Sequence, residues 1–203
     1  MKKTFLLSCL MLAAMPVMAA YTGHVYVDKN KNGVFDQSEK PLAGIKVSDG
    51  LNVVETAADG SFTLPGHERE RFIFITTPSG YKTFNRHYHK IEKKQSGYDF
   101  GLIPYSGRIR KDGSHRYIHI TDTEIFNTEN HADWVNNVRD YARNEQAAFI
   151  IHTGDICYEK GLKAHIKLMN TENMDCPVFY CIGNHDLVKG KYGEELFESI
   201  YGP

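Results

Sequence analysis

The chain has 203 residues, with 24 Lys and Arg against 25 Asp and Glu, and 41% of its residues are hydrophobic. This composition is that of a folded globular protein of one or two domains. The net charge of −1 gives no general attraction to nucleic acids or to anionic membranes, so neither is expected as a partner.

Residues 1–19 have the pattern of a secretory signal peptide. Lys2 and Lys3 give a positive start, residues 5–15 form an apolar run too short to span a bilayer, and residues 17–19 end it with a small-residue cleavage pattern. We therefore expect cleavage after Ala19 and a mature protein in the periplasm or outside the cell. No later segment is apolar over the length that a transmembrane span requires, and the sequence does not indicate the oligomeric state.

Residues 20–104 alternate short β-type runs with turn residues such as Asp49-Gly50 and Asp59-Gly60. The expected strands are residues 22–27, 43–49, 52–57, 60–64, 71–77 and 97–103. This regular spacing predicts a small antiparallel β-sandwich of the immunoglobulin or transthyretin-like kind. Residues 55–64 also resemble the strand-turn-strand of the carboxypeptidase-regulatory-like and B-type repeat sandwiches. Residues 105–114, polar and containing glycine, are expected to be a linker.

Residues 28–39, between the first two expected strands, have the spacing of a twelve-residue calcium loop. Its candidate ligands, at positions one, three, five, seven, nine and twelve, are Asp28, Asn30, Asn32, the Val34 carbonyl, Asp36 and Glu39. Gly33 stands at position six, where such a loop turns sharply. The strand-like flanks predict a calcium loop set in a β-domain, as in the adhesin B-type repeats that it resembles. The alternative is a plain Asn/Gly turn whose acids bind nothing.

Strands and helices alternate over residues 115–203. The expected strands are residues 116–120, 147–153 and 177–182, and the expected helices are residues 131–144, 161–170 and 194–201. This order predicts an α/β domain with parallel neighbouring strands, whose C-terminal ends meet at one edge of the sheet. The predicted fold is therefore a β-sandwich domain followed by an α/β domain.

A polar signature follows each expected strand of the α/β domain. Asp122 and Glu124 follow the first, a Gly-Asp pair that ends in Asp155 follows the second, and a Gly-Asn-His-Asp run with Asn184 and His185 follows the third. Taken alone, the first two acids could hold a metal, share a proton or merely solubilise a loop. Together the five offer carboxylates, an amide oxygen and an imidazole, which are ligands for two neighbouring divalent ions.

This series of motifs resembles the calcineurin-like metallophosphoesterases, and more closely their secreted bacterial members with an N-terminal β-domain. The resemblance implies that Asp122 binds the first metal, that Asp155 bridges both metals and that Asn184 binds the second. His185 would lie beside the leaving group as a general acid or as a donor to the phosphoryl group. The implied reaction is hydrolysis of a phosphate mono- or diester, a small molecule or another phosphodiester, by hydroxide bridging two Mn, Fe or Zn ions.

For two acids the sequence leaves two alternative roles open. Glu124 stands where the family pattern has a histidine, and it is either a metal ligand that favours harder ions or a solvated loop acid. Asp186, taken with His185 as a candidate catalytic residue, either orients His185 or faces solvent. His119 and His152 are expected in the core or behind the ligands rather than in the metal shell.

No histidine follows His185, whereas the family's later motifs supply three that complete the metal shells. We therefore expect an incomplete second metal site, impaired activity and a chain that is the N-terminal part of a longer protein or the product of an interrupted gene. Residues 115–203 would then be only the first half of the phosphoesterase sheet sandwich. The alternative function is a non-catalytic, secreted, calcium-binding β-module fused to a degenerate phosphoesterase remnant.

The cysteines do not predict a disulfide framework. Cys157, Cys176 and Cys181 would remain after signal cleavage, and an odd number argues against full pairing. We expect Cys176 and Cys181, which bracket an expected buried strand, to be small core residues.

Overall fold

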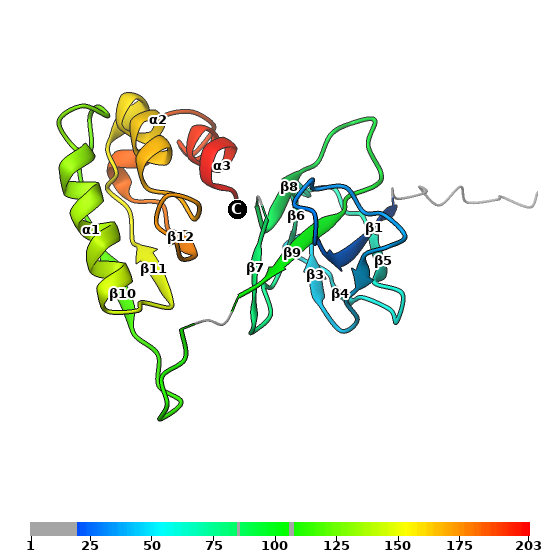
Figure 1. Ribbon diagram of the computed structural model, residues 1–203. Helices are drawn as coiled ribbons and strands as arrows, with labels where there is room; N and C mark the ends of the chain where they lie inside the picture. Colours follow the sequence, from blue (N-terminus) through cyan, green and yellow to red (C-terminus); the bar gives the residue numbers. More distant parts are fainter. Residues whose placement is uncertain (1–19, 85, 106–107) are drawn as a thin grey trace, which may run out of the picture.

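The computed structural model describes residues 20–84, 86–105 and 108–203. The expected signal peptide, residues 1–19, lies outside the described residues. Figure 1 shows a β-rich part followed along the chain by a part in which helices accompany a small sheet. Within the described ranges, no helix combines the length and the apolar character needed to cross a membrane.

The β-rich part contains two sheets. Its strands are β1 (Ala20–Val27), β2 (Lys40–Pro41), β3 (Lys46–Ser48), β4 (Val53–Glu55), β5 (Ser61–Pro65), β6 (Phe72–Ile75), β7 (Tyr81–Thr83), β8 (Tyr88–Lys90) and β9 (Phe100–Pro104). One sheet has the order β2-β1-β9-β7, with β5 also paired to β1, and the other has the order β4-β3-β6-β8. Each of the six expected runs contains a strand, whereas β2, β7 and β8 were not expected.

The expectation of an entirely antiparallel arrangement is wrong at one pair. β1 and β9 run parallel, with Tyr26 opposite Gly101. The chain reaches β9 only after passing through the other sheet, and such a long crossover can return a strand in the same direction, which a hairpin cannot. The buried core of this part draws on both sheets, with Val25 and Phe100 from one and Val47 and Ile73 from the other.

The second part has the alternating order that the sequence predicts. Its elements are β10 (Tyr117–Ile120), α1 (Ala132–Asn144), β11 (Phe149–His152), α2 (Tyr158–Leu168), β12 (Val178–Tyr180), the short 3-10 helix η1 (Asn184–Asp186) and α3 (Glu195–Tyr201). The three strands pair in the order β10-β11-β12, and both pairs are parallel. The prediction of parallel neighbours is confirmed.

The two faces of this sheet differ because successive side chains in a strand point to opposite sides. Ile150 and Val178 lie on the buried face and pack in one cluster with Val135 of α1 and Ala164 of α2. The opposite face carries aromatic rings, among them Phe179, which is 40% exposed.

The three cysteines are free, and Cys157 and Cys176 are buried. Cys181, however, is exposed, so the expectation of a core residue is wrong for it. It follows Phe179 by two positions and therefore lies on the same open face of the sheet.

Helix α3 contacts the β-rich part. The Tyr88 hydroxyl of β8 donates a hydrogen bond to the Ile200 carbonyl at 3.1 Å. The Arg71 guanidinium forms ion pairs with Glu198 at 2.8 Å and with Glu194 at 3.3 Å.

Candidate active site

The loops that follow β10 and β11 are joined through their backbones. The Asp122 N–H donates to the Gly154 carbonyl at 3.1 Å, and the Glu124 N–H donates to the Asp155 carbonyl at 3.3 Å. The loop after β10 therefore continues the pairing of the two strands beyond their ends. This places Asp122 and Glu124 alongside the loop that carries Asp155.

The loops that follow β11 and β12 touch at two glycines. A Cβ atom on Gly154 would lie 2.3 Å from the backbone nitrogen of Gly183, and a Cβ on Gly183 would lie 2.2 Å from the backbone nitrogen of Asp155. Gly154 also has a positive φ of 92°, which an L-residue with a side chain rarely adopts. Glycine is therefore required at both positions by the close approach of the neighbouring loop.

Backbone strain is concentrated in the same loops. Of the nine non-glycine residues with positive φ in the described part, five lie in the two segments 122–124 and 155–158: Asp122, Glu124, Asp155, Cys157 and Tyr158. Such conformations cost on the order of 1–3 kcal/mol each, and they cluster where a structure must hold side chains in a set position.

His185 lies against both neighbouring loops. Its backbone N–H donates to Asp155 Oδ1 at 3.1 Å, and its Nδ1 lies 3.8 Å from Glu124 Oε1. Its ring stacks on Tyr158 with centroids 5.7 Å apart and an interplanar angle of 11°. Asn184, at the start of η1, is exposed. The structure therefore brings His185, Glu124 and Asp155 together, and it adds Tyr158, which nothing in the sequence distinguishes.

Asp186 is fully buried and ties the last two loops together. Its Oδ1 accepts hydrogen bonds from the Ile156 N–H at 2.8 Å and the Cys157 N–H at 2.9 Å, and its Oδ2 accepts one from the Gly183 N–H at 2.9 Å. Hydrogen bonds to an ionised carboxylate are stronger than those between neutral groups. Of the two alternatives for Asp186, exposure to solvent is wrong, and the three hydrogen bonds that it accepts come from backbone N–H groups rather than from the His185 ring.

His152 supports the first loop from the buried side of the sheet. The Gly154 N–H donates to its Nδ1 at 3.2 Å, so the proton is on Nε2, which donates to Thr123 Oγ1 at 2.9 Å. Burial lowers the pKa of His152 to about 4, so the ring is neutral at pH 7. The expectation of a core position is confirmed for His152. His119, in contrast, is exposed, with its Nε2 2.9 Å from Thr153 Oγ1.

Two family models match the chain. Residues 29–104 match the model described as N terminal of Calcineurin-like phosphoesterase, and residues 115–202 match the model described as Calcineurin-like phosphoesterase. The chain belongs to the calcineurin-like phosphoesterase family. A search of curated proteins gave no match. Members of this family are hydrolases that act on phosphate esters and bind divalent metal ions.

The donor atoms at the strand ends have the chemistry that such a phosphoesterase needs. Asp122, Glu124 and Asp155 offer carboxylate oxygens and Asn184 offers an amide oxygen, which suit hard or intermediate divalent ions. In the described ranges, no three acids, histidines or cysteines of these loops hold ligand atoms within 4.8 Å of one another. Binding an ion would therefore require side-chain rotation, which Asp122 and Glu124 have room for because both are exposed.

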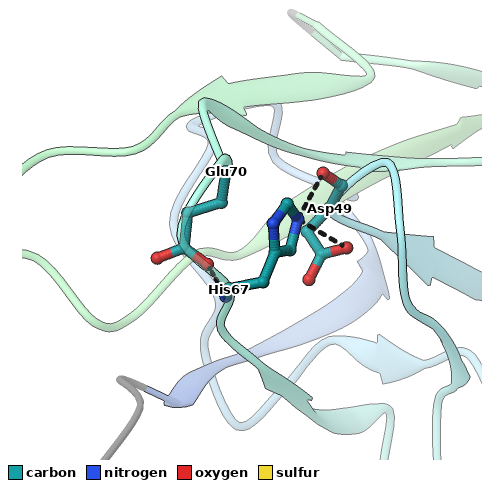
Figure 2. A group of neighbouring side chains, drawn as sticks. All are labelled: Asp49, His67 and Glu70. Carbon is teal, nitrogen blue, oxygen red and sulfur yellow. Dashed lines mark hydrogen bonds and ion pairs between the residues drawn. The ribbon is translucent and has the colours of Figure 1, made fainter. Parts of the chain in front are cut away.

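Among the described residues, one group does meet that spacing, and it lies in the β-rich part. Asp49, His67 and Glu70 hold ligand atoms within 4.8 Å of one another (Figure 2). Sequence reasoning missed this group, because its members lie on separate turns that only the fold brings together.

The polar atoms of this group already have hydrogen-bond partners. His67 Nδ1 accepts from the Arg69 N–H at 3.2 Å, and Nε2 lies 3.4 Å from the Asp49 carbonyl oxygen. Glu70 accepts hydrogen bonds from the Tyr21 hydroxyl and from the His67 N–H. Burial acts to raise the pKa of Asp49, but hydrogen bonds from Asn52 and Leu51 lower it below its usual value. The arrangement therefore ties two turns together without needing an ion.

Proposed function

We propose that this protein is an exported phosphoesterase that hydrolyses phosphate mono- or diesters at the loops after β10, β11 and β12. Asp122, Glu124, Asp155 and Asn184 would hold divalent ions of Mn, Fe or Zn, and His185 would face the leaving group. The observation that supports this most is the joining of three separate strand ends at one place. The Asp122 and Glu124 N–H groups bond the loop after β10 to the loop after β11, and Asp186 and two touching glycines join the loops after β11 and β12. Membership of a metal-dependent hydrolase family supports it independently.

The chain's own residues would contribute binding and positioning. Bound divalent ions would supply charge neutralisation at the phosphoryl oxygens and a lower pKa for attacking water. The bond from the His185 N–H to Asp155 and the stacking on Tyr158 fix the imidazole at the rim of the site. From there the ring could donate a proton to the leaving oxygen, while Glu124 on its Nδ1 side would orient it.

Hydrolysis of p-nitrophenyl phosphate and of bis-p-nitrophenyl phosphate with added Mn²⁺ tests the proposal. Asp155→Asn should lower the rate about a thousandfold, because it removes the carboxylate charge at the point where the loops that carry Glu124 and His185 meet. Asp133→Asn is the matched control, since Asp133 is an exposed acid in the first turn of α1 and should leave the rate unchanged. A folded, Mn²⁺-loaded protein without hydrolysis would instead favour the non-catalytic calcium-binding β-module. The distances between the carboxylates of Asp122, Glu124 and Asp155, which do not meet the spacing of a metal site, are compatible with that alternative as well.

We also propose that the β-rich part is a β-sandwich and that the protein is exported. Support for the sandwich comes from the single buried cluster that both sheets share, and support for export comes from the sequence of residues 1–19. β1 begins at Ala20, directly after the expected cleavage position. Mass spectrometry of the protein recovered from the periplasm should give a mature N-terminus at Ala20. An intact Met1 in the cytoplasmic fraction would contradict export.

A further inference from the structure

The loop between β1 and β2, residues 28–39, closes on itself at its base. Val27 and Lys40 are cross-strand partners, so Asp28 and Glu39 lie next to each other although they are eleven positions apart. Glu39 Oε1 accepts a hydrogen bond from the Lys29 N–H at 3.0 Å, which confirms that the Glu39 carboxylate reaches the start of the loop. The fold thus brings together the first and last positions of the twelve-residue pattern.

Backbone N–H groups in the middle of the loop point toward the Asp28 side chain. Its two carboxylate oxygens accept hydrogen bonds from the Asn32 N–H at 3.1 Å and from the Gly33 N–H at 2.9 Å. Gly33 has a positive φ of 71°, as the turn at position six requires. Asp36, at position nine, is half-buried and accepts a hydrogen bond from Asn30 Nδ2 at 3.2 Å.

The two carboxylates at the base lack a counter-charge. Asp28 is 1% exposed and Glu39 is 6% exposed, and neither forms an ion pair with any residue in the described ranges. Burying one unpaired carboxylate is costly, and placing a second beside it adds repulsion. A divalent cation would remove both penalties.

Tyr26 provides a separate sign of a missing component. Its hydroxyl is buried and has no hydrogen-bond partner among the described residues. The Tyr26 ring packs against Phe35, position eight of the loop, at 4.9 Å between centroids. Tyr26 is 0% exposed and precedes Asp28 by two positions, and the Asp28 N–H continues the β1–β9 pairing by donating to the Leu102 carbonyl at 2.9 Å, so the two side chains lie on the same side of the sheet. A buried hydroxyl in such a place normally bonds to a water molecule or an ion.

We propose that residues 28–39 bind one Ca²⁺, with Asp28, Asn30, Asn32, the Val34 carbonyl and Glu39 as ligands. Asp36 would reach the ion through a water molecule, as position nine of such loops often does, and the Tyr26 hydroxyl would bond to a water of the same shell. Ca²⁺ accepts six to eight oxygens in an irregular cage, whereas Mg²⁺ demands a smaller octahedron, so Ca²⁺ is the fitting ion. This site is separate from the strand-end loops and does not rest on the proposed hydrolysis.

The expected consequence is a calcium-dependent clamp on the β-rich part. β1 pairs with β2, β5 and β9, so it is the central strand of its sheet. An ion that fixes the β1–β2 connection would stabilise that sheet directly. With only three carboxylates in the loop, we expect weak binding, with a Kd on the order of 10⁻⁴ M.

Calorimetric titration of the whole chain with CaCl₂ tests the proposal. Asp28→Asn and Glu39→Gln should abolish binding of one Ca²⁺, and Asn32→Asp should tighten it about tenfold because it adds a ligand charge. The gain expected for Asn32→Asp keeps the test sound if the other variants fold poorly. Asp59→Asn is the matched control, since Asp59 is an exposed acid that holds a turn through Ser61 in the same part of the protein.

Two further variants locate the bound ion. Tyr26→Phe should weaken Ca²⁺ binding several-fold while leaving the calcium-free protein at least as stable, because it removes only an unpartnered hydroxyl. Asp155→Asn should leave the Ca²⁺ affinity unchanged. Absence of saturable Ca²⁺ binding in both the wild type and Asn32→Asp would overturn the proposal. Binding that is lost in Asp155→Asn but kept in Asp28→Asn would overturn it as well.

Discussion

The acids of the β-rich part and those of the α/β part are held in opposite ways. In the loop of residues 28–39, Asp28 and Glu39 accept hydrogen bonds from N–H groups three to ten positions away. Asp186 accepts two of its three from N–H groups 29 and 30 positions away. The first arrangement is therefore a local unit, whereas the second exists only when the parallel sheet has formed. Changes to one should leave the other intact.

The largest difference between the two regions is expected for Gly183→Ala, which should affect phosphoesterase activity but not Ca²⁺ binding. The new methyl group would collide with Asp155 and force the last two loops apart, and a shift of about 1 Å in a catalytic group can cost a hundredfold or more in rate. Phosphoesterase activity should therefore fall at least about a hundredfold while Ca²⁺ binding stays unchanged. Gly97→Ala is the matched control, because a Cβ there meets no atom within 4 Å. Equal rates for the two variants would contradict the close contact of the loops.

Asp186→Asn should destabilise the α/β part by about 3 kcal/mol, because an amide cannot accept from all three N–H groups. Trp134 is the one tryptophan of the chain and belongs to α1, so its fluorescence reports the unfolding of this part. Urea unfolding followed at Trp134 should shift to lower urea for Asp186→Asn. The exposed-acid variant Asp133→Asn should shift far less. A similar shift in both variants would contradict the stabilising role of the Asp186 hydrogen bonds.

Acid should weaken the same part through two buried histidines. Burial lowers the pKa of His152 to about 4 and that of His165 to about 3, whereas an unfolded histidine titrates near 6.5. Between these values the unfolded chain binds protons that the folded chain does not, so stability decreases as the pH falls below 6.5. From pH 7.5 to pH 5 the expected loss is about 2 kcal/mol for each histidine.

Urea unfolding at several pH values, followed at Trp134, measures this loss. His119→Gln should keep the same pH dependence, since His119 is exposed. His165→Leu should reduce it. A stability that increases toward pH 5 would contradict the neutral, buried state of the two rings.

The smallest expected effect belongs to Glu124→His. A histidine in this place should tighten Zn²⁺ or Mn²⁺ binding by about tenfold if the position belongs to the metal shell. Metal titration of the variant against the wild type measures this change. Glu129→His serves as the control, because Glu129 is an exposed acid in the same connection between β10 and α1. An unchanged affinity in Glu124→His would make Glu124 a loop acid.

Hydrophobic periodicity was enough to predict most of the elements. The strands β10, β11 and β12 and the helices between them have long, regular apolar patterns, and each was predicted close to its place. β2, β7 and β8 were missed because each is short and lies in a mostly polar stretch, without the apolar run that surrounds the equally short β3, β4 and β12. Their pairing depends on neighbours that are far away in the sequence.

The candidate site was predictable as a set of loops but not as a set of roles. The positions of Asp122, Asp155 and His185 after strands follow from the chain itself, since parallel strands end at one edge. The role of Asp186 does not, because only the fold shows that two distant N–H groups, those of Ile156 and Cys157, point at it. Tyr158 was not predicted for the same reason, because its contact with His185 joins two loops that are distant in the sequence.

The contact between Gly154 and Gly183 fixes the spacing of two loops of the candidate site through the main chain alone. Neither position tolerates even a methyl group without moving the other loop. Side-chain changes at exposed positions, such as Glu124 or Tyr158, can therefore alter charge and ligand preference without changing the spacing of these loops. Changes to the chemistry of the site and changes to the loop spacing are thus separable, and only the second requires rebuilding the backbone.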